Sequence, residues 1–441
     1  MNQPPLPMGV MPDHALKSAY RKTAWRIIPL LIVCYLFAYL DRVNVGFAKL
    51  QMLDDLKFSE AVYGLGAGIF FIGYVMFEVP SNIALHRFGA RRWISRIMVS
   101  WGFLSAAMMF IETPMAFYVL RFLIGVAEAG FFPGIIFYLT TWFPNHRRGA
   151  ITAMFLTALP VSIMVGALVS GLIMQHFDGV AGYAGWQWLF VIEGLPAVAL
   201  GAAVFFLLRD KIADAHWLTP EERRGMQAAI DREATHKQSH RLRDGLCSPQ
   251  LWMLGVVYFC LVLGLYVISF WLPTIIRNSG VQQPAVIGVL SAIPFAAAII
   301  AMVLVGRSSD RCREYRWHLA ICAGIGALGI AFGTYFSASL VLAMIGLTVG
   351  TAAIISSLPI FWNMPSALVG GAAAATGVAL INSLGNMAGF FGTTVVGWVT
   401  QATGSTQTAM YIMALILVVG GGLGLLVYRM RSTPVAEAGK Q

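Results

Sequence analysis

Residues 35–46 read YLFAYLDRVNVG, which places an acid and a base, Asp41 and Arg42, side by side inside an apolar run. The run is long enough to cross a bilayer. A charge at that depth is costly unless it finds a partner or reaches water, so intramembrane charges are candidates for a functional site. A second pair, Arg121 and Glu128, lies in a later apolar run. The sequence therefore predicts a charged centre inside a membrane-embedded protein.

The composition is that of a membrane protein. Of the 441 residues, 58% are hydrophobic and 11% are charged, whereas a soluble domain carries about 25% charged residues. The net charge of +10 does not indicate nucleic-acid binding, because the basic residues stand in short loops between apolar runs. The five cysteines are scattered, which predicts no disulfide framework. We expect an all-α polytopic membrane protein.

Twelve apolar windows of roughly 20 residues predict twelve transmembrane helices in two bundles of six. The first six windows are 26–46, 61–84, 96–112, 115–140, 149–174 and 186–208. The second six are 250–276, 285–306, 317–336, 338–361, 369–400 and 408–428. The expected organisation is an N-terminal tail (1–25), a first bundle (26–208), a linker (209–249), a second bundle (250–428) and a C-terminal tail (429–441).

Loop charges predict the orientation. With the N-terminus inside, 25 of the 30 Lys and Arg residues fall in cytoplasmic segments, and three (Lys49, Lys57 and Arg277) fall in external loops. Basic residues collect on the cytoplasmic side of membranes, so both termini and the linker are expected in the cytoplasm, at a cell inner membrane. In the linker, residues 219–222 (TPEE) predict a helix from about 220 to 235, with Thr219 as N-cap and Glu222 reaching back.

The two halves repeat. Basic turns at 82–92 and 306–311 stand after the second span of each half. Two six-helix repeats with a site at the middle of the membrane are typical of transporters that rock one half against the other.

The four intramembrane charges are expected to converge near the middle and outer part of the bundle. A separation of seven residues keeps Arg121 and Glu128 on one helical face. A carboxyl group in a partly dry cavity can carry a proton at neutral pH, which favours Asp41 and Glu128 as proton carriers. The planar guanidinium of Arg42 matches a carboxylate ligand. The alternative is two structural ion pairs, and for Arg121 the two interpretations are evenly balanced.

The other intramembrane acids are weaker candidates. Glu78 and Glu193 lie close to the membrane interfaces, where a cap or a buried ion pair is the favoured role. Amides at mid-membrane either bond to a neighbouring helix or bind substrate, and aromatic rings with a few polar groups are typical of small-ligand cavities. The mid-span polar and aromatic residues are Tyr39, Tyr74, Tyr266, Ser269, Trp271, Ser357, Trp362, Asn382 and Asn386.

The sequence carries no nucleotide-binding loop, no catalytic constellation and no histidine spacing suited to a metal. We therefore expect no enzyme activity, no cofactor and no metal, and transport driven by an ion gradient.

On these motifs the chain resembles the major facilitator superfamily over nearly its whole length. More narrowly it resembles the anion:cation symporter family, in the branch of tartrate, phthalate and hydroxyphenylacetate permeases. The segments that carry the resemblance are 39–44 (YLDRVN), 78–82 (EVPSN), 121–130 (RFLIGVAEAG), 185–194 (GWQWLFVIEG) and 379–386 (ALINSLGN), with the turns 82–92 and 306–311.

The resemblance implies proton-coupled import of an organic anion by alternating access. It implies that Asp41 and Glu128 take part in proton coupling and that Arg42 holds the substrate carboxylate. It also implies that Tyr39, Tyr74 and Asn386 line the substrate cavity. The wider set of expected substrate-binding residues adds Asn382, Ser357, Trp362 and Tyr266. Residues expected in ion pairs or gating are Arg121, Asp310, Arg311 and Arg87.

Three positions depart from the family pattern. His86 stands where the superfamily turn usually has an acid, and Asn82 stands where it has a glycine. These changes weaken the case for an electrostatic latch in the first half, whereas Asp310 retains it in the second. Gly392-Thr393-Thr394 stands where relatives often have a proline.

Two other functions stay open beside a proton:carboxylate symporter. A proton-coupled antiporter that exports amphipathic compounds would need no fixed Arg in its cavity, so Arg42 counts against it. A non-transporting membrane sensor would need a soluble domain, and the 41-residue linker (209–249) is too small for one. We favour aliphatic hydroxy acids such as tartrate, or sugar acids, on the resemblance alone, while aromatic acids stay open. We expect a monomer with a small organic acid, protons and the lipid bilayer as its partners.

Overall fold

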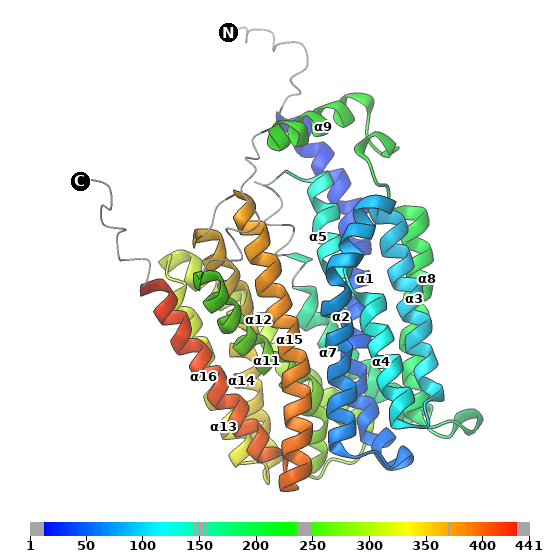
Figure 1. Cartoon of the computed structure of the whole chain (residues 1–441), viewed down its shortest axis with the longest axis vertical. Coiled ribbons are helices and arrows are strands. Elements are labelled where there is room, and N and C mark those ends of the chain that lie inside the picture. The colour runs from blue at the N-terminus through cyan, green and yellow to red at the C-terminus, as the bar shows by residue number, and fades with distance from the viewer. Residues whose placement is uncertain are drawn as a thin grey trace.

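The computed structural model describes residues 13–144, 157–235, 249–368 and 371–429, together with Arg147, Ile151, Met154 and Phe155. Within these residues the chain is almost wholly helical (Figure 1). The helices of the first half are α1 (Asp13–Leu56), α2 (Glu60–Phe88), α3 (Ala90–Ala107), α4 (Pro114–Glu128), α5 (Phe131–Trp142), α7 (Ala158–His176) and α8 (Gly185–Leu207). The linker contains α9 (Pro220–Thr235). The helices of the second half are α11 (Pro249–Asn278), α12 (Pro284–Cys312), α13 (Arg316–Tyr335), α14 (Leu340–Leu368), α15 (Gly371–Thr403) and α16 (Thr406–Arg429).

Eleven spans within the described residues are long and apolar enough to cross a membrane. From Gly371 onward the window predicted at 369–400 is also helical, as part of α15, but α15 is not among these eleven. Large apolar side chains such as Leu328, Val341 and Leu415 are exposed on the outer faces of the helices, as expected for surfaces that contact lipid rather than water. The predicted class, a polytopic α-helical membrane protein, is confirmed.

Helix α1 is much longer than the window predicted at 26–46. Its 44 residues would span about 66 Å at 1.5 Å per residue, more than twice the hydrocarbon thickness. Residues 13–25 of the expected tail are therefore helical. The prediction that Lys49 lies in an external loop is wrong, because Lys49 is buried inside α1. Of the window predicted at 149–174, α7 accounts for the part from Ala158, and most of the earlier residues lie outside the described ranges.

The window predicted at 115–140 is broken in the middle. Helix α4 ends at Glu128 and α5 begins at Phe131, with Gly130 between them in the left-handed conformation (φ 82°). A Cβ atom at Gly130 would lie 2.5 Å from the Ser81 hydroxyl, so both the backbone conformation and the space favour glycine. The Ser81 hydroxyl donates a hydrogen bond to the Ala129 carbonyl at the break. The break therefore joins α4 and α5 to α2 directly beside Glu128.

The two halves stand side by side and are in close contact at the end away from α9 (Figure 1). There α2 packs against α15, and α7 packs against α12. A Cβ atom at Gly64 would lie 2.6 Å from the Thr393 carbonyl oxygen, and one at Gly288 would lie 2.5 Å from the Ala167 carbonyl oxygen. Small residues let the backbones of the halves meet at this end.

Candidate substrate and proton site

A cavity of about 810 Å³ lies between the two halves. Its wall includes Arg42 of α1, Glu128 of α4 and Tyr266 of α11, and it reaches Arg307 and Asp310 in the last turns of α12, at the α9 end. At the opposite end the halves are joined by hydrogen bonds and an ion pair. The Tyr63 hydroxyl donates to the Phe270 carbonyl at 3.3 Å, and Arg277 pairs with Asp54 at 3.2 Å. The cavity is thus closed at one end and extends toward the other.

Arg42 is at the centre of the polar contacts in the cavity wall. Its Nη2 atom donates to Glu128 Oε1 in a buried ion pair, and its Nη1 atom donates to the Tyr266 hydroxyl at 3.3 Å. Its guanidinium also lies over the rings of Tyr39 at 5.0 Å and Tyr74 at 5.2 Å. Its Nε atom is buried and has no hydrogen-bond partner among the described residues. A carboxylate can bind a guanidinium side-on through two parallel hydrogen bonds, from Nε and Nη2. Here Glu128 takes only the Nη2 bond, and Nε remains available as a donor.

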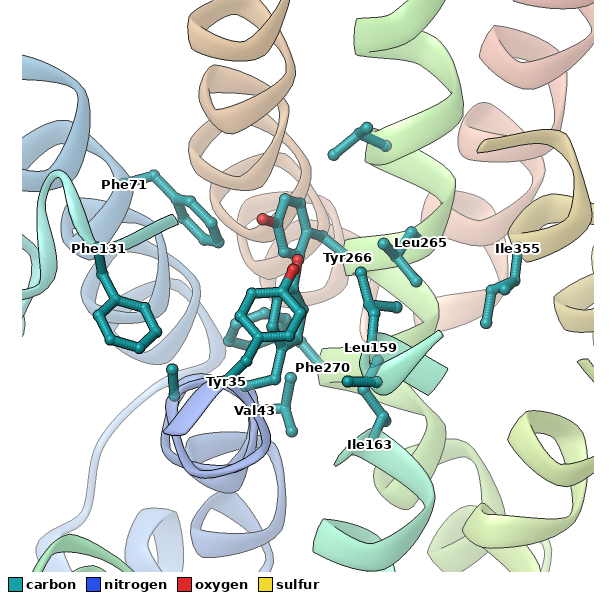
Figure 2. Close-up of a cluster of buried hydrophobic side chains, with 14 of the residues drawn as sticks. Tyr35, Val43, Phe71, Phe131, Leu159, Ile163, Leu265, Tyr266, Phe270 and Ile355 are labelled. Atoms are coloured by element: carbon teal, nitrogen blue, oxygen red, sulfur yellow. The ribbon is translucent and has the colours of Figure 1, made fainter. Parts of the chain in front are cut away.

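Aromatic rings from both halves surround this ion pair. Phe71 of α2 contacts Tyr266 of α11 with ring centres 4.6 Å apart, and Tyr35 contacts Tyr39 on α1 at 5.1 Å. Figure 2 shows Tyr35, Phe71, Tyr266 and Phe270 gathered where α1, α2 and α11 meet. The apolar surroundings strengthen the Arg42–Glu128 attraction, because water does not screen it there.

Asp41 does not share the cavity with Arg42. Its Oδ1 atom accepts hydrogen bonds from the Ser105 hydroxyl of α3 and from Asn44 Nδ2 at 3.3 Å. Neighbouring residues on a helix point about 100° apart, so one of the two faces the cavity and the other faces the interior of the first half. Of the four charges predicted to converge, Arg42 and Glu128 line the cavity, and Asp41 and Arg121 do not.

Arg121 is buried against backbone rather than against an acid. Its Nε and Nη2 atoms donate to the Gly66 and Ala67 carbonyls of α2, each at 3.4 Å, and its guanidinium lies 4.9 Å from the Phe70 ring centre. Among the described residues it has no carboxylate oxygen within 4 Å. The expected ion pair of Arg121 is therefore not present, and its contacts join α2 to α4.

The predicted substrate-binding residues divide into two groups. Those that line the cavity are Tyr39, Arg42, Tyr74, Tyr266, Trp362, Asn382 and Asn386. Ser357 does not, because it is fully buried and its hydroxyl donates to the Ile354 carbonyl of its own helix at 2.6 Å. Asn382 lines the cavity but is already engaged, since its Nδ2 atom donates to Glu78 Oε1 at 2.8 Å. Ser383 donates to the other oxygen of Glu78 at 3.3 Å. Glu78 thus joins α2 to α15 across the two halves.

The predicted gating residues have different positions. Asp310 lines the cavity at the α9 end, beside Arg307, which was not predicted. Arg311 is exposed at the end of α12, and Arg87 lines a separate pocket at the end of α2. Neither Arg87 nor Arg311 has a carboxylate oxygen within 4 Å in the part of the chain that the structure describes, so the expected ion pairs of these two are not present.

One buried charge, Lys49, went unrecognised as a candidate. Lys49 pairs with Glu60 at 2.7 Å and lies over the rings of Tyr63 at 4.9 Å and Trp271 at 5.1 Å. Lys49 is seven residues after Arg42, and this spacing on one long helix was a signal that both share a face. Glu193, predicted to be a cap or ion pair near an interface, is fully buried and accepts a hydrogen bond from Ser170 at 2.7 Å.

A helical membrane protein whose two halves enclose a cavity that holds buried charges, closed at one end, is a membrane transporter for small molecules. The chain belongs to the Major Facilitator Superfamily, whose family model matches residues 31–393. The resemblance to this superfamily is confirmed, and the family is one of transporters rather than enzymes.

Similar proteins agree with this assignment over nearly the whole chain. A Pseudomonas putida protein named as metabolite transport protein NicT is 48% identical over 404 residues, covering 91% of this chain and 92% of that protein. An Agrobacterium vitis protein named for tartrate transport is 44% identical over 430 residues, covering 97% and 95%. A quinolone resistance transporter of Acinetobacter baumannii is 39% identical over 419 residues, covering 93% and 95%.

The fold is also similar to a solved structure. It superposes on a bacterial homologue of the human lysosomal transporter Spinster, in an inward-facing and occupied conformation, with a TM-score of 0.75 at 15% identity, covering 93% of this chain and 97% of that one.

Proposed function

We propose that this protein imports a small organic carboxylate together with protons, by alternating access. The observation that carries the proposal is the buried Arg42–Glu128 pair in the wall of the cavity between the halves. A guanidinium with a free Nε donor beside Nη2 is suited to a carboxylate ligand. A carboxyl group that competes with that ligand for the same cation is suited to couple binding to protonation.

The coupling follows from competition for one guanidinium. While Glu128 is ionised it occupies Nη2 of Arg42, and a substrate carboxylate would meet a second negative charge beside the site. Protonation of Glu128 removes that charge, which leaves Nε and Nη2 free to hold the substrate carboxylate through two parallel hydrogen bonds. When the substrate leaves, loss of the proton restores the ion pair. Each import cycle then moves one carboxylate with at least one proton.

The same pair would also oppose the movement of protons without substrate. A protonated Glu128 without substrate leaves Arg42 buried and unpaired, which costs about 3–5 kcal/mol when one partner of a buried ion pair is removed. The empty, protonated protein is therefore rarely populated. Asp41, held by Ser105 and Asn44 behind the cavity wall, is our second proposed proton carrier.

The substrate class is supported by the lining and by relatives. The amide of Asn386 and the hydroxyl groups of Tyr39 and Tyr74 line the same cavity as Arg42, and they can hydrogen-bond the hydroxyl groups of a hydroxy acid. The relative named for tartrate transport favours this class. We propose an aliphatic hydroxy acid or sugar acid as the cargo.

The loop charges support an inner-membrane protein with both termini in the cytoplasm. In that orientation the end of the molecule that carries α9 is cytoplasmic, and the cavity extends toward the cytoplasm. We propose that the protein works as a monomer, because the cavity is built from the two halves of one chain.

Export of amphipathic compounds is the competing function, and the quinolone resistance relative favours it. The test is uptake of a panel of labelled acids, with tartrate, a sugar acid and an aromatic acid, into proteoliposomes with and without an imposed proton gradient. Gradient-driven accumulation of one acid that is lost in Arg42→Ala supports import. Arg224→Ala is the matched control, because Arg224 is exposed on α9 and outside the cavity. Outward movement of a fluoroquinolone with no accumulation of any acid would contradict the proposal.

A further inference from the structure

A second pocket, of about 620 Å³, lies at the α9 end of the first half. It is formed by the turn between α2 and α3 and by the segment that follows α8. We call it the basic pocket. Its charged and titratable lining residues are Arg87, Arg91, Arg92, Arg209, Lys211, Asp210, Asp214, His86 and His216. Five cations and two carboxylates thus face one hollow.

The positive charge of the basic pocket is not neutralised by ion pairs. None of its five Lys and Arg side chains lies within 4 Å of a carboxylate oxygen among the described residues. Asp210 binds backbone rather than one of these side chains, because its Oδ1 atom accepts a hydrogen bond from the backbone N–H of Arg91 at 2.8 Å, in the first turn of α3. The Nε atom of Arg91 is buried without a hydrogen-bond partner in the described part of the chain. An anion in this pocket would therefore meet unpaired guanidinium groups.

A smaller hollow of about 390 Å³ shares Arg209 and His216 with the basic pocket. It adds Arg26, which lies over the Trp217 ring at 5.5 Å, and the apolar side chains of Phe206 and Leu207. Phe206 is 69% exposed and Leu207 is 52% exposed at the end of α8. The cations thus stand where membrane-spanning helices end and apolar side chains project outward, which is the level of lipid headgroups.

We propose that the basic pocket and the hollow beside it bind the headgroup of an anionic phospholipid, with its acyl chains along Phe206 and Leu207. Phosphate oxygens accept hydrogen bonds from Arg in a planar, two-pronged geometry. Basic pockets on one side of helical membrane proteins attract anionic headgroups. Two adjoining hollows that share Arg209 fit a headgroup with two phosphates, so cardiolipin is the lipid expected to bind best.

The experiment uses the full chain purified in detergent. Native mass spectrometry counts retained lipid, and thermal unfolding is measured with added cardiolipin, phosphatidylethanolamine or inorganic pyrophosphate. We expect cardiolipin to be retained and to raise the melting temperature, an effect that falls with added salt. Phosphatidylethanolamine, which has no net charge, should do neither. A pyrophosphate effect equal to that of cardiolipin would overturn the lipid assignment, and so would equal retention of both lipids. These measurements need no variant.

The variant Arg91→Gln with Arg209→Gln removes two cations of the basic pocket. At about 1 kcal/mol per basic residue near a charged membrane surface, cardiolipin should bind about 30-fold more weakly. Arg311→Gln with Arg313→Gln is the matched control, because it removes two cations from the corresponding turn of the second half. Unchanged cardiolipin affinity in the first variant would overturn the proposal, and so would an equal loss in the control. Gel filtration and melting without lipid check the folding of both variants.

Discussion

The two halves of the molecule differ in where they keep charge. The first half buries Asp41, Arg42, Arg121, Glu128 and Glu193 within its spans. The second half has no Asp, Glu, Lys or Arg from residue 317 to residue 428. Around Arg42 and Glu128 its contribution to the cavity is rings and amides, such as Tyr266, Trp362 and Asn386, and its charged lining residues, Arg307 and Asp310, lie at the α9 end. The difference indicates that the first half carries the charged groups that bind substrate and protons, whereas the second half shapes the cavity and moves relative to the first.

The contacts between the halves fit this division. Around the cavity a charged group of the first half meets an uncharged partner in the second, as Arg42 meets Tyr266 and Glu78 meets Asn382. A hydrogen bond between a charged and a neutral group costs less to break than a buried ion pair. Such contacts can be exchanged as the halves rock, whereas the Arg42–Glu128 pair stays within one half.

Arg42→Ala should cause the largest loss. The change removes the cation that pairs with Glu128 and leaves that carboxyl without its partner. We expect the initial rate of uptake of the acid found in the panel to fall at least ~30-fold, since truncating one partner of a buried, hydrogen-bonded charge pair costs about 2–5 kcal/mol. Initial rates in proteoliposomes, with protein amount matched by quantitative gel, give the measurement.

Tyr266→Phe is the matched change in the second half. It removes the hydroxyl that accepts from Arg42 Nη1 at 3.3 Å but keeps the ring. We expect a loss of about 10-fold, in line with about 1.5 kcal/mol for a hydrogen bond to a charged group. A loss as large as that of Arg42→Ala would break the comparison, because the second half would then carry an equal share of the chemistry.

Glu128→Gln should separate exchange from coupling. Glutamine is neutral at every pH, so it imitates the protonated carboxyl and leaves Arg42 available to substrate. We expect counterflow exchange of the acid to continue while accumulation driven by a proton gradient falls to the equilibrium level. Accumulation that persists in this variant would exclude Glu128 as the proton carrier. Asp41→Asn in the same assay tests the second proposed carrier.

Asn382→Ala should have an intermediate effect, on stability more than on chemistry. It removes the donor to Glu78 Oε1 at 2.8 Å and leaves a buried carboxyl oxygen unsatisfied, which costs about 1–3 kcal/mol. We expect a lower melting temperature in detergent, and a smaller decrease for Ser383→Ala, whose bond to Glu78 is longer at 3.3 Å. An unchanged melting temperature with a raised KM would instead make Asn382 a substrate ligand.

The sequence was sufficient for what depends on composition and local pattern. Apolar windows located the membrane spans, because only helices satisfy their own backbone in lipid. The linker helix was predicted at 220–235 and is found as Pro220–Thr235. Its predicted cap is confirmed, since the Thr219 backbone N–H donates to Glu222 Oε2 at 2.9 Å and the Glu222 N–H donates to Thr219 Oγ1 at 3.2 Å. Such caps depend on residues four positions apart or fewer.

What the sequence could not supply was the rotation and length of helices in the bundle. Asp41 and Arg42 are neighbours in the chain, but α1 is packed so that Asp41 contacts Ser105 and Arg42 contacts Glu128. Lys49 was misplaced because a window fitted to the bilayer ends before α1 does. The break at Gly130 was missed because the apolar run continues through it. These features depend on contacts between distant segments, which hydropathy does not record.

The smallest effect is expected for Glu222→Gln, which tests how much the ion pair with Lys22 contributes to holding the linker helix α9 against α1 of the first half. Burial opposes ionisation of Glu222, but the hydrogen bond from the Lys22 ammonium, aided by the Thr219 N–H, outweighs it and lowers the pKa of this carboxyl. Lys22 Nζ lies 2.7 Å from Glu222 Oε1 and is half exposed, so the pair should contribute only about 0.5 kcal/mol. A lowered folded-state pKa stabilises above the unfolded pKa of about 4.3, and this advantage is lost as the pH falls from there through the folded-state pKa. We therefore expect the wild type to melt slightly above Glu222→Gln at pH 7 and the difference to shrink steadily as the pH is lowered below about 4.3. A difference that stays constant across this range would mean that the α9 contact depends on packing rather than on charge.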